Sequence, residues 1–101
     1  MLNTLENLFN LARERKKSPV DGSYTNKLLS DKSLSKKKVL EEINELIEAV
    51  ENNSNKIHET ADVLYHLIMY LEVHEIKIED VCKELDKRKK WLNHVKLYQI
   101  L

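Results

Sequence analysis

The chain has very few of the residues that loop-rich or disulfide-bonded folds require. One glycine, one proline and one cysteine occur among its 101 residues. Because glycine and proline form most tight turns, their scarcity disfavours folds with many short connections and favours long helices. The single Cys82 has no partner for an internal disulfide, and neither a secretory signal nor a transmembrane span is recognisable. We therefore expect an all-α protein of the cytoplasm.

A net charge is absent as well. The 17 lysine and arginine residues are balanced by 17 aspartate and glutamate residues, so no overall charge attracts a nucleic acid or a membrane surface. We expect neither as a partner. Charged residues still make up 34% of the chain, a proportion typical of helical bundles. The length fits one domain with a modest hydrophobic core.

Apolar residues recur at helical spacing, and short polar segments separate the stretches that show it. This pattern predicts a bundle of about four to five helices. Ser33 or Ser35 is the expected N-cap of the second long helix. Cys82 lies on the apolar face of the last helix, where we expect it to be buried. The first predicted helix ends near residue 17. Further helical segments are expected over about 24–29, 33–50 and 56–74, and a last helix is expected to begin at residue 78.

Acidic side chains form two phased groups. Glu41, Glu42 and Glu45 lie in one predicted helix, and Glu59 and Asp62 lie at the start of the next. Residues three or four apart share a helix face, so antiparallel packing of the two helices would bring the groups together. A ring of carboxylate oxygens suits a hard cation such as Mg²⁺, and such ions most often serve to handle phosphates.

Each group also has an ordinary explanation. A run such as Glu-Glu-x-x-Glu is common on solvated helix faces, and Glu59 would be favoured near a helix N-terminus by the helix dipole. Asp62 is different, because it stands one residue before a long apolar run, where an unpaired carboxylate is costly to desolvate. Asp62 therefore needs a partner, which could be a cation, an N-terminal amide or a metal.

Three segments, in this order along the chain, resemble one known family. They are Ser23-Tyr24-Thr25 followed by Lys27-Leu28-Leu29, then Lys38-Val39-x-Glu41-Glu42-x-x-Glu45, then Glu59-x-Ala61-Asp62-x-Leu64-Tyr65-His66-Leu67. Together they resemble the phosphoribosyl-ATP pyrophosphohydrolases, enzymes of the second step of histidine biosynthesis. The carboxylate pattern alone is shared with the wider MazG-like superfamily of all-α NTP pyrophosphohydrolases. The Ser-Tyr-Thr segment and the Tyr65-His66 pair single out the histidine-pathway branch.

The resemblance covers roughly residues 5 to 88. We therefore expect a pyrophosphohydrolase-like helical domain over residues 1–88 and a C-terminal helical extension over residues 89–101. The chain departs from the family pattern at Leu40 and Ile43, where members commonly have glycine and alanine. Both positions lie off the proposed metal-binding face, so we expect them to alter packing more than chemistry.

The resemblance implies a reaction and a cofactor. The expected activity is the Mg²⁺-dependent hydrolysis of phosphoribosyl-ATP to phosphoribosyl-AMP and pyrophosphate. Lys38 would place a positive charge near the leaving pyrophosphate, and Glu41 would serve as an outer-sphere ligand, a ligand of a second metal or the general base. The expected ligands of Mg²⁺ are Glu42, Glu45, Glu59 and Asp62.

Further residues would bind the substrate. Tyr65 and His66 could stack on or hydrogen-bond the base, although His66 could equally donate to a neighbouring carbonyl or orient Asp62. Arg13 could equally belong to a solvated helix face. The full set of expected substrate-binding residues is Arg13, Arg15, Ser23, Tyr24, Thr25, Lys27, Tyr65 and His66.

The predicted helix over 56–74 is apolar on nearly every side between residues 63 and 71, and a bundle of this size cannot cover it. Relatives solve this by pairing two chains, so we expect a homodimer that completes the bundle. Two other functions stay open. One is a MazG-like pyrophosphohydrolase acting on non-standard nucleotides, and the other is a catalytically silent helical interaction module.

Overall fold

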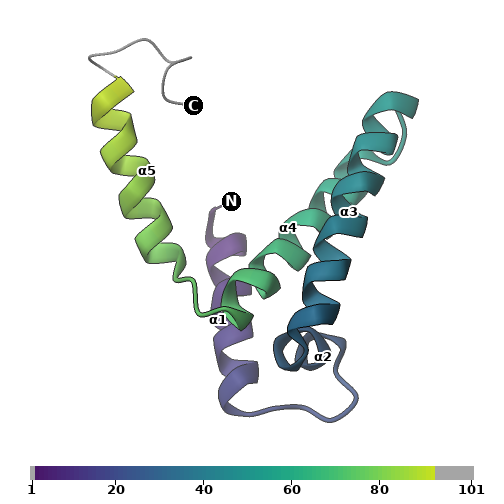
Figure 1. Ribbon diagram of the computed structural model, residues 1–101, viewed down its shortest axis with the longest axis vertical. Helices are drawn as coiled ribbons and strands as arrows, with labels where there is room; N and C mark the ends of the chain where they lie inside the picture. The colour runs from purple at the N-terminus through teal and green to yellow at the C-terminus, as the bar shows by residue number, and fades with distance from the viewer. Residues whose placement is uncertain (1, 93–101) are drawn as a thin grey trace.

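The computed structural model describes residues 2–92, and these residues form an all-α fold (Figure 1). In chain order the helices are α1 (Leu2–Lys17), α2 (Tyr24–Ser30), α3 (Lys32–Asn52), α4 (Lys56–Val73) and α5 (Ile78–Leu92). The predicted fold class is confirmed, and the predicted helix bounds agree within a few residues. Most of the expected C-terminal extension, residues 93–101, lies outside the described residues. None of the described helices has the length and apolar content needed to cross a bilayer.

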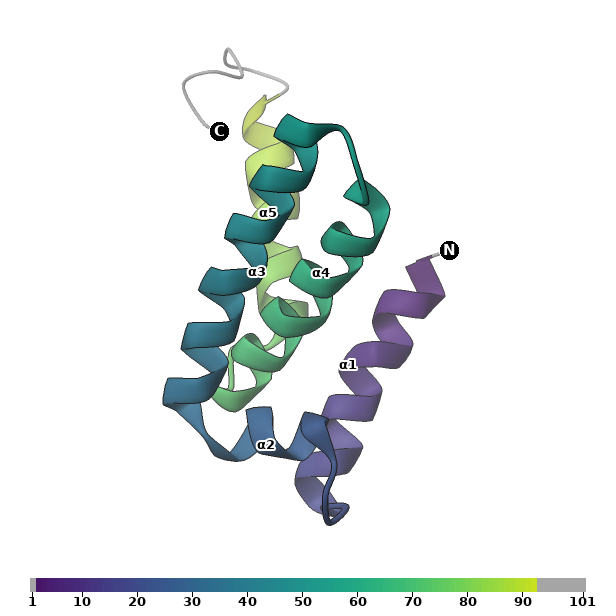
Figure 2. The ribbon, with the colours of Figure 1, turned by 90° about the vertical axis from the view of Figure 1, so that its right-hand side faces the viewer.

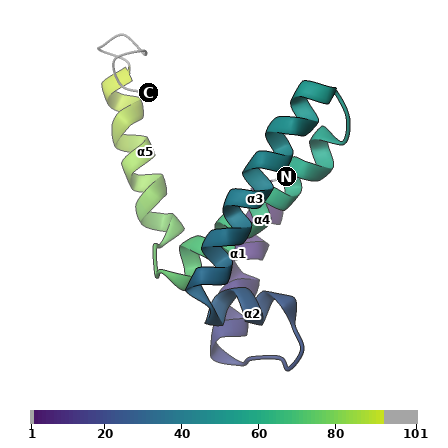
Figure 3. The same cartoon turned by 45° about the vertical axis from the view of Figure 1, so that its right-hand side comes forward.

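Helices α3 and α4 form an antiparallel pair, and the other helices are arranged around its lower end. Figure 2 shows α1 running beside α4 and the short α2 lying across the base. In contrast, α5 leans away from the pair, so the chain has the outline of a V (Figures 1 and 3). The antiparallel pair is the element that decides where the acidic groups lie.

The connection between α3 and α4 reverses the chain within residues 53–55. Asn53 and Asn55 both adopt left-handed backbone conformations, with φ of 52° and 51°. The backbone N–H of Asn53 bonds the carbonyls of Ala49 and Val50, which closes the end of α3. Asparagine tolerates this conformation better than most residues, so a glycine is not needed for the turn.

The N-cap of α3 is Asp31. Its side chain accepts a hydrogen bond of 3.0 Å from the backbone N–H of Leu34. The prediction of Ser33 or Ser35 as the cap was wrong, because the helix begins at Lys32 and both serines lie inside its first turns. Asp31 also ends α2, so one residue separates the two helices.

The core lies where α1, α2 and α4 meet. Phe9 and Ala12 of α1, Leu28 of α2, and Ile68 and Met69 of α4 form its buried cluster. Partly buried apolar side chains pack around this cluster: Leu5, Leu8, Leu29, Leu34, Tyr65, Leu71 and Ile78. The core therefore fixes α2 against the face of α4 that carries Tyr65 and His66.

Several apolar residues of α3 and α4 are not covered. Leu64 and Leu67 of α4, within the stretch that is apolar on nearly every side, are 39% and 38% exposed in the single chain. On α3, Ile43, Ile47 and Val50 are 39%, 50% and 57% exposed. This agrees with the expectation that a bundle of this size cannot cover the apolar helix, because α1 and α2 cover only part of the α3–α4 pair.

Cys82 is exposed, so the prediction that it is buried was wrong. The reason is the direction of α5, which leans away from the α3–α4 pair (Figure 3), so that Cys82 borders an open hollow shared with Leu5 and Phe9 of α1 in place of a packed core.

Removing the central core side chain is expected to destabilise the fold. Met69 has no exposed surface, so Met69→Ala should lower the free energy of unfolding by about 2–5 kcal/mol through lost contacts and a cavity. Urea denaturation followed by circular dichroism measures this. The exposed Lys83→Ala should change it by less than about 0.5 kcal/mol. Equal effects of the two substitutions would contradict this placement of the core.

Candidate active site

Carboxylate groups from α3 and α4 converge at one place. Oxygens of Glu42 and Glu45 from α3 and of Glu59 from α4 lie within 4.8 Å of one another. Glu59 also belongs to a second group with His58 and Asp62, again within 4.8 Å. The spacing of the acidic residues predicted this meeting, and the antiparallel pair produces it. We call these five residues the acidic cluster.

Electrostatic conditions in the acidic cluster are unfavourable for its charges. Burial raises the pKa of Glu42, and hydrogen bonding and repulsion by Glu45 raise it further. Burial also raises the pKa of Glu59, again with a contribution from the charge of Glu45. In addition, Oε2 of Glu42 and Oε2 of Glu59 are buried, and no donor in the described part of the chain reaches either atom.

Such a donor set fits a divalent cation. Hard ions such as Mg²⁺ prefer carboxylate oxygens, and a positive charge would offset both the repulsion and the unmet acceptor atoms. The residues that could hold the ion are Glu42, Glu45, Glu59 and Asp62, the set expected from the sequence. His58 is an addition that sequence reasoning missed. Its Nε2 lies 3.4 Å from Oδ2 of Asp62, and their i, i+4 spacing was the signal that could have identified it.

The two expected catalytic residues pair with each other. Nζ of Lys38 lies 3.2 Å from Oε2 of Glu41, and this bond raises the pKa of Lys38. Glu41 stays outside the acidic cluster, although it belongs to the same acidic stretch of α3. The charges of Lys38 and Glu42 influence the pKa of Tyr24, so the start of α2 lies near the part of α3 that carries these two residues. Burial is the main cause that raises the pKa of Tyr24, which keeps its hydroxyl protonated.

Tyr24 and Thr25 of α2 are bonded to consecutive residues of α4. The Tyr24 hydroxyl lies 2.8 Å from Nε2 of His66, and the Thr25 and Tyr65 hydroxyls hydrogen-bond each other. Nδ1 of His66 lies 2.7 Å from the carbonyl oxygen of Asp62. The expectation that His66 donates to a neighbouring carbonyl is therefore confirmed.

The loop before α2 carries a further part of the expected substrate wall. Ser23 caps α2, and its Oγ accepts a hydrogen bond of 2.8 Å from Arg15. Asn26 ties this loop down, since its side chain bonds the backbone of both Val20 and Arg15. A surface hollow of about 340 Å³ here is lined in part by Arg15, Ser23 and Lys27. Sequence reasoning named these three lining residues but not Asn26.

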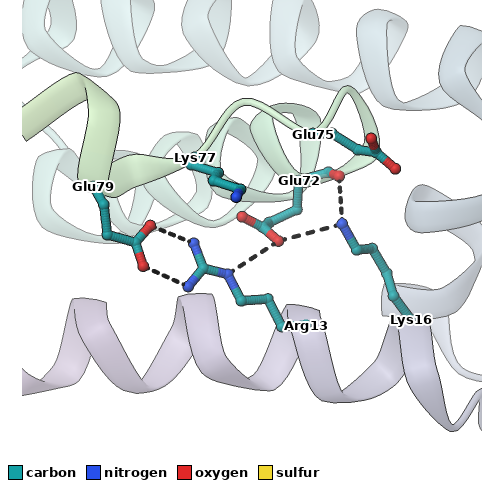
Figure 4. A pocket seen from close by; sticks show the side chains of 6 residues that line it. All are labelled: Arg13, Lys16, Glu72, Glu75, Lys77 and Glu79. Carbon is teal, nitrogen blue, oxygen red and sulfur yellow. Dashed lines mark hydrogen bonds and ion pairs between the residues drawn. The ribbon is translucent and has the colours of Figure 1, made fainter.

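Arg13 is not brought to the acidic cluster. Its guanidinium forms two bonds of 2.8 and 2.7 Å with Glu79, and its Nε lies 3.4 Å from Glu72 (Figure 4). Lys16 completes the arrangement, with Nζ 3.4 Å from the buried Glu72 carboxylate. Glu72 follows Asp62 by ten residues on α4, a rise of about 15 Å. Arg13 therefore connects α1 to α4 and α5.

The fold and the acidic cluster together define a class of protein. This class consists of all-α domains in which Glu-x-x-Glu and Glu-x-x-Asp motifs meet across an antiparallel helix pair, beside a wall of hydroxyl and basic groups. Comparison with known proteins identifies the member of this class. The family model described as phosphoribosyl-ATP pyrophosphohydrolase matches residues 2–89. The chain belongs to this family.

Named relatives agree with this family. A phosphoribosyl-ATP pyrophosphatase of Clostridium acetobutylicum is 44% identical over 88 residues, which cover 83% of this chain and 79% of the relative. A protein of the same name from Clostridium botulinum is 41% identical over 86% of this chain and 82% of its own length. One from Bacillus cereus is 40% identical over 94% of this chain and 92% of its own.

Neutralising one carboxylate should stabilise the protein without metal. The folded state raises the pKa of Glu42, so it keeps this proton to higher pH than the unfolded chain does. The free energy of unfolding therefore falls as the pH rises through the folded-state pKa. In EDTA at pH 7.5, Glu42→Gln should raise the melting temperature by roughly 2–5 °C, with a smaller rise at pH 5. Differential scanning fluorimetry measures both.

The control for this experiment is Glu51→Gln, which neutralises an exposed carboxylate of the same helix. It should leave the melting temperature nearly unchanged at both pH values. A lower melting temperature for Glu42→Gln at pH 7.5 would show that Glu42 is stabilised by its surroundings and would contradict the repulsion described above.

Proposed function

We propose that this protein hydrolyses phosphoribosyl-ATP to phosphoribosyl-AMP and pyrophosphate in a Mg²⁺-dependent reaction, as a cytoplasmic enzyme of the second step of histidine biosynthesis. The observation that carries the proposal is the convergence of Glu42, Glu45 and Glu59 within 4.8 Å, with buried oxygens that lack donors among the described residues. Membership of the phosphoribosyl-ATP pyrophosphohydrolase family supplies the substrate.

The acidic cluster would hold Mg²⁺ through Glu42, Glu45, Glu59 and Asp62. When bound, the ion supplies charge neutralisation of the phosphate chain and lowers the pKa of a coordinated water. Without it, these carboxylates would repel a polyphosphate, so the cluster alone cannot bind the substrate's charged chain. The protein's own contribution is to keep the oxygens together at the α3–α4 pair, where Oε2 of Glu42 and Oε2 of Glu59 are buried.

Lys38 and Glu41 stand beside the acidic cluster and have separate tasks. Lys38 is a point charge that attracts phosphate oxygens and stabilises the charge developing on the leaving pyrophosphate. Glu41 lies next to Glu42 in the chain but stays outside the cluster, and we assign it as the acceptor of the proton from the attacking water. Their 3.2 Å ion pair holds both side chains at the same edge of the site.

The wall formed by the α2 region would bind the rest of the substrate. Ser23, Arg15 and Lys27 line one hollow, where a hydroxyl and two cations suit the phosphate of the phosphoribosyl group. Tyr24 and Tyr65 stack with ring centroids 6.4 Å apart and an interplanar angle of 17°. These rings offer an aromatic surface for the base. The bond from Arg15 to Ser23 keeps the basic group at this hollow.

A homodimer is part of the proposal. The exposed apolar side chains of α3 and α4 include Ile43, Ile47, Val50, Leu64 and Leu67, all on helices that build the site. Burying such side chains against a second copy of the chain would stabilise both, at about 25 cal/mol for each Å² of apolar surface removed from water. The partner would then complete the bundle that one chain leaves open.

The activity is tested by pyrophosphate release. Phosphoribosyl-ATP should be cleaved with Mg²⁺ present and not in EDTA, whereas simple NTPs should be poor substrates. Asp62→Asn should lower kcat/KM by at least about 100-fold, because even residues that only support a metal's ligands cost 10–100-fold when changed. The exposed Asp86→Asn on α5 is the matched control. Cleavage of simple NTPs in preference to phosphoribosyl-ATP would instead favour the MazG-like alternative.

Assembly is tested by light scattering. The wild-type chain should show twice its 12.0 kDa mass at micromolar concentration. Ile47→Glu places a charge on the exposed apolar face of α3, where desolvating it would be costly, and should give a monomer. Leu11→Glu, a like substitution at a 38% exposed residue of α1, should leave the dimer intact. A wild-type monomer would refute the proposed assembly.

A further inference from the structure

His66 is a buried residue whose two ring nitrogens are both engaged. It is 7% exposed, and it lies between Asp62 one turn earlier on α4 and Tyr24 at the start of α2. The carbonyl oxygen of Asp62 can only accept a hydrogen bond, so Nδ1 of His66 carries the proton that is donated to it. In the neutral ring Nε2 is then an acceptor, and the Tyr24 hydroxyl donates to it.

The bond to Asp62 is additional to the helix. In a regular α-helix the carbonyl of one residue already accepts the backbone N–H four residues later. The imidazole of His66 therefore adds a second hydrogen bond to the Asp62 carbonyl, at 2.7 Å. This peptide group belongs to the turn that carries Asp62 and, three residues earlier, Glu59. Both residues belong to the acidic cluster.

The imidazole is also held in orientation by its neighbours. The Tyr24 ring meets it edge-on at 5.7 Å and 72°, and the Tyr65 ring does so at 5.1 Å and 87°. Thr25 bonds the Tyr65 hydroxyl, so α2 is joined to α4 at two consecutive residues. An imidazole fixed on three sides transmits the position of α2 to the α4 turn with little freedom of its own.

We propose that His66 is a positioning residue that, through the Tyr24 hydroxyl, sets the α4 turn bearing Glu59 and Asp62 for cation binding. The inference rests on the proposed function, because it takes these carboxylates as Mg²⁺ ligands. It assigns Tyr24 a task that does not require substrate. The substrate wall and the metal-binding turn then form one hydrogen-bonded unit, so loss of the Tyr24 hydroxyl weakens Mg²⁺ binding in the free protein.

The test is Mg²⁺ titration by isothermal calorimetry, without nucleotide, on the full chain. Tyr24→Phe removes only the donor to Nε2. His66→Asn keeps an N–H near the position of Nδ1 and removes the acceptor for Tyr24. Outer partners of metal ligands change affinity by 10–100-fold, and this contact is one bond more remote, so each variant should bind Mg²⁺ about 3- to 10-fold more weakly.

The double variant distinguishes positioning from general damage. If the Tyr24–His66 bond is the connection, combining Tyr24→Phe with His66→Asn should weaken Mg²⁺ binding no more than either change alone. His66→Gln, which loses the donor near Nδ1, should weaken it at least as much as His66→Asn. Ile68→Val removes a core methyl from the same helix and should lower the melting temperature without changing Mg²⁺ affinity.

The outcomes separate this inference from the proposed function. A wild-type chain that binds no Mg²⁺ would remove both proposals. Wild-type binding together with unchanged affinity in Tyr24→Phe would overturn the positioning role of His66 and leave the proposed function standing. Additive losses in the double variant, or an equal loss of affinity in Ile68→Val, would likewise overturn it.

Discussion

Repulsion among carboxylates is the interaction on which the rest of this structure depends. Glu42, Glu45 and Glu59 are held within 4.8 Å of one another, and burial makes the negative charges of Glu42 and Glu59 harder to sustain. Nothing in the geometry of a single helix requires this. It results from packing α3 against α4 across a three-residue turn, in which two asparagines adopt left-handed backbone conformations. The hydrophobic core must therefore supply enough stability to hold like charges together, and the proposed cation would offset their repulsion.

The helices outside this pair add what a carboxylate cluster lacks. Helix α2 brings hydroxyl and basic groups to the border of the acidic cluster. The Lys38–Glu41 pair lies near both α2 and the cluster. The core fixes α2 through Leu28 and α4 through Met69, so the wall and the α4 side of the acidic cluster are anchored in the same core. Membership of the phosphoribosyl-ATP pyrophosphohydrolase family agrees with the proposed roles of the cluster as a cation site and of the wall as an anion site.

Local patterns predicted the features that depend on helix geometry. The convergence of Glu42, Glu45 and Glu59 follows from three- and four-residue spacing plus one antiparallel turn. Local patterns could not predict how the helices are placed relative to one another. Arg13 was expected at the substrate, but its partner Glu79 is 66 residues away in the chain. Cys82 was expected in the core because its helix is amphipathic, and periodicity does not reveal that this helix departs from the bundle.

The guanidinium of Arg13 donates two hydrogen bonds to the carboxylate of Glu79 in the first turn of α5. This contact restrains the angle at which α5 leaves the bundle. The pair lowers the pKa of Glu79 to about 2 and raises that of Arg13, so acidification within the range of living cells leaves both charges in place. Dissolved salt acts differently, because an ion pair this exposed to solvent is weakened as the ionic strength rises. The ionic contact that joins α1 to α5 is thus insensitive to acidification and weakened by salt.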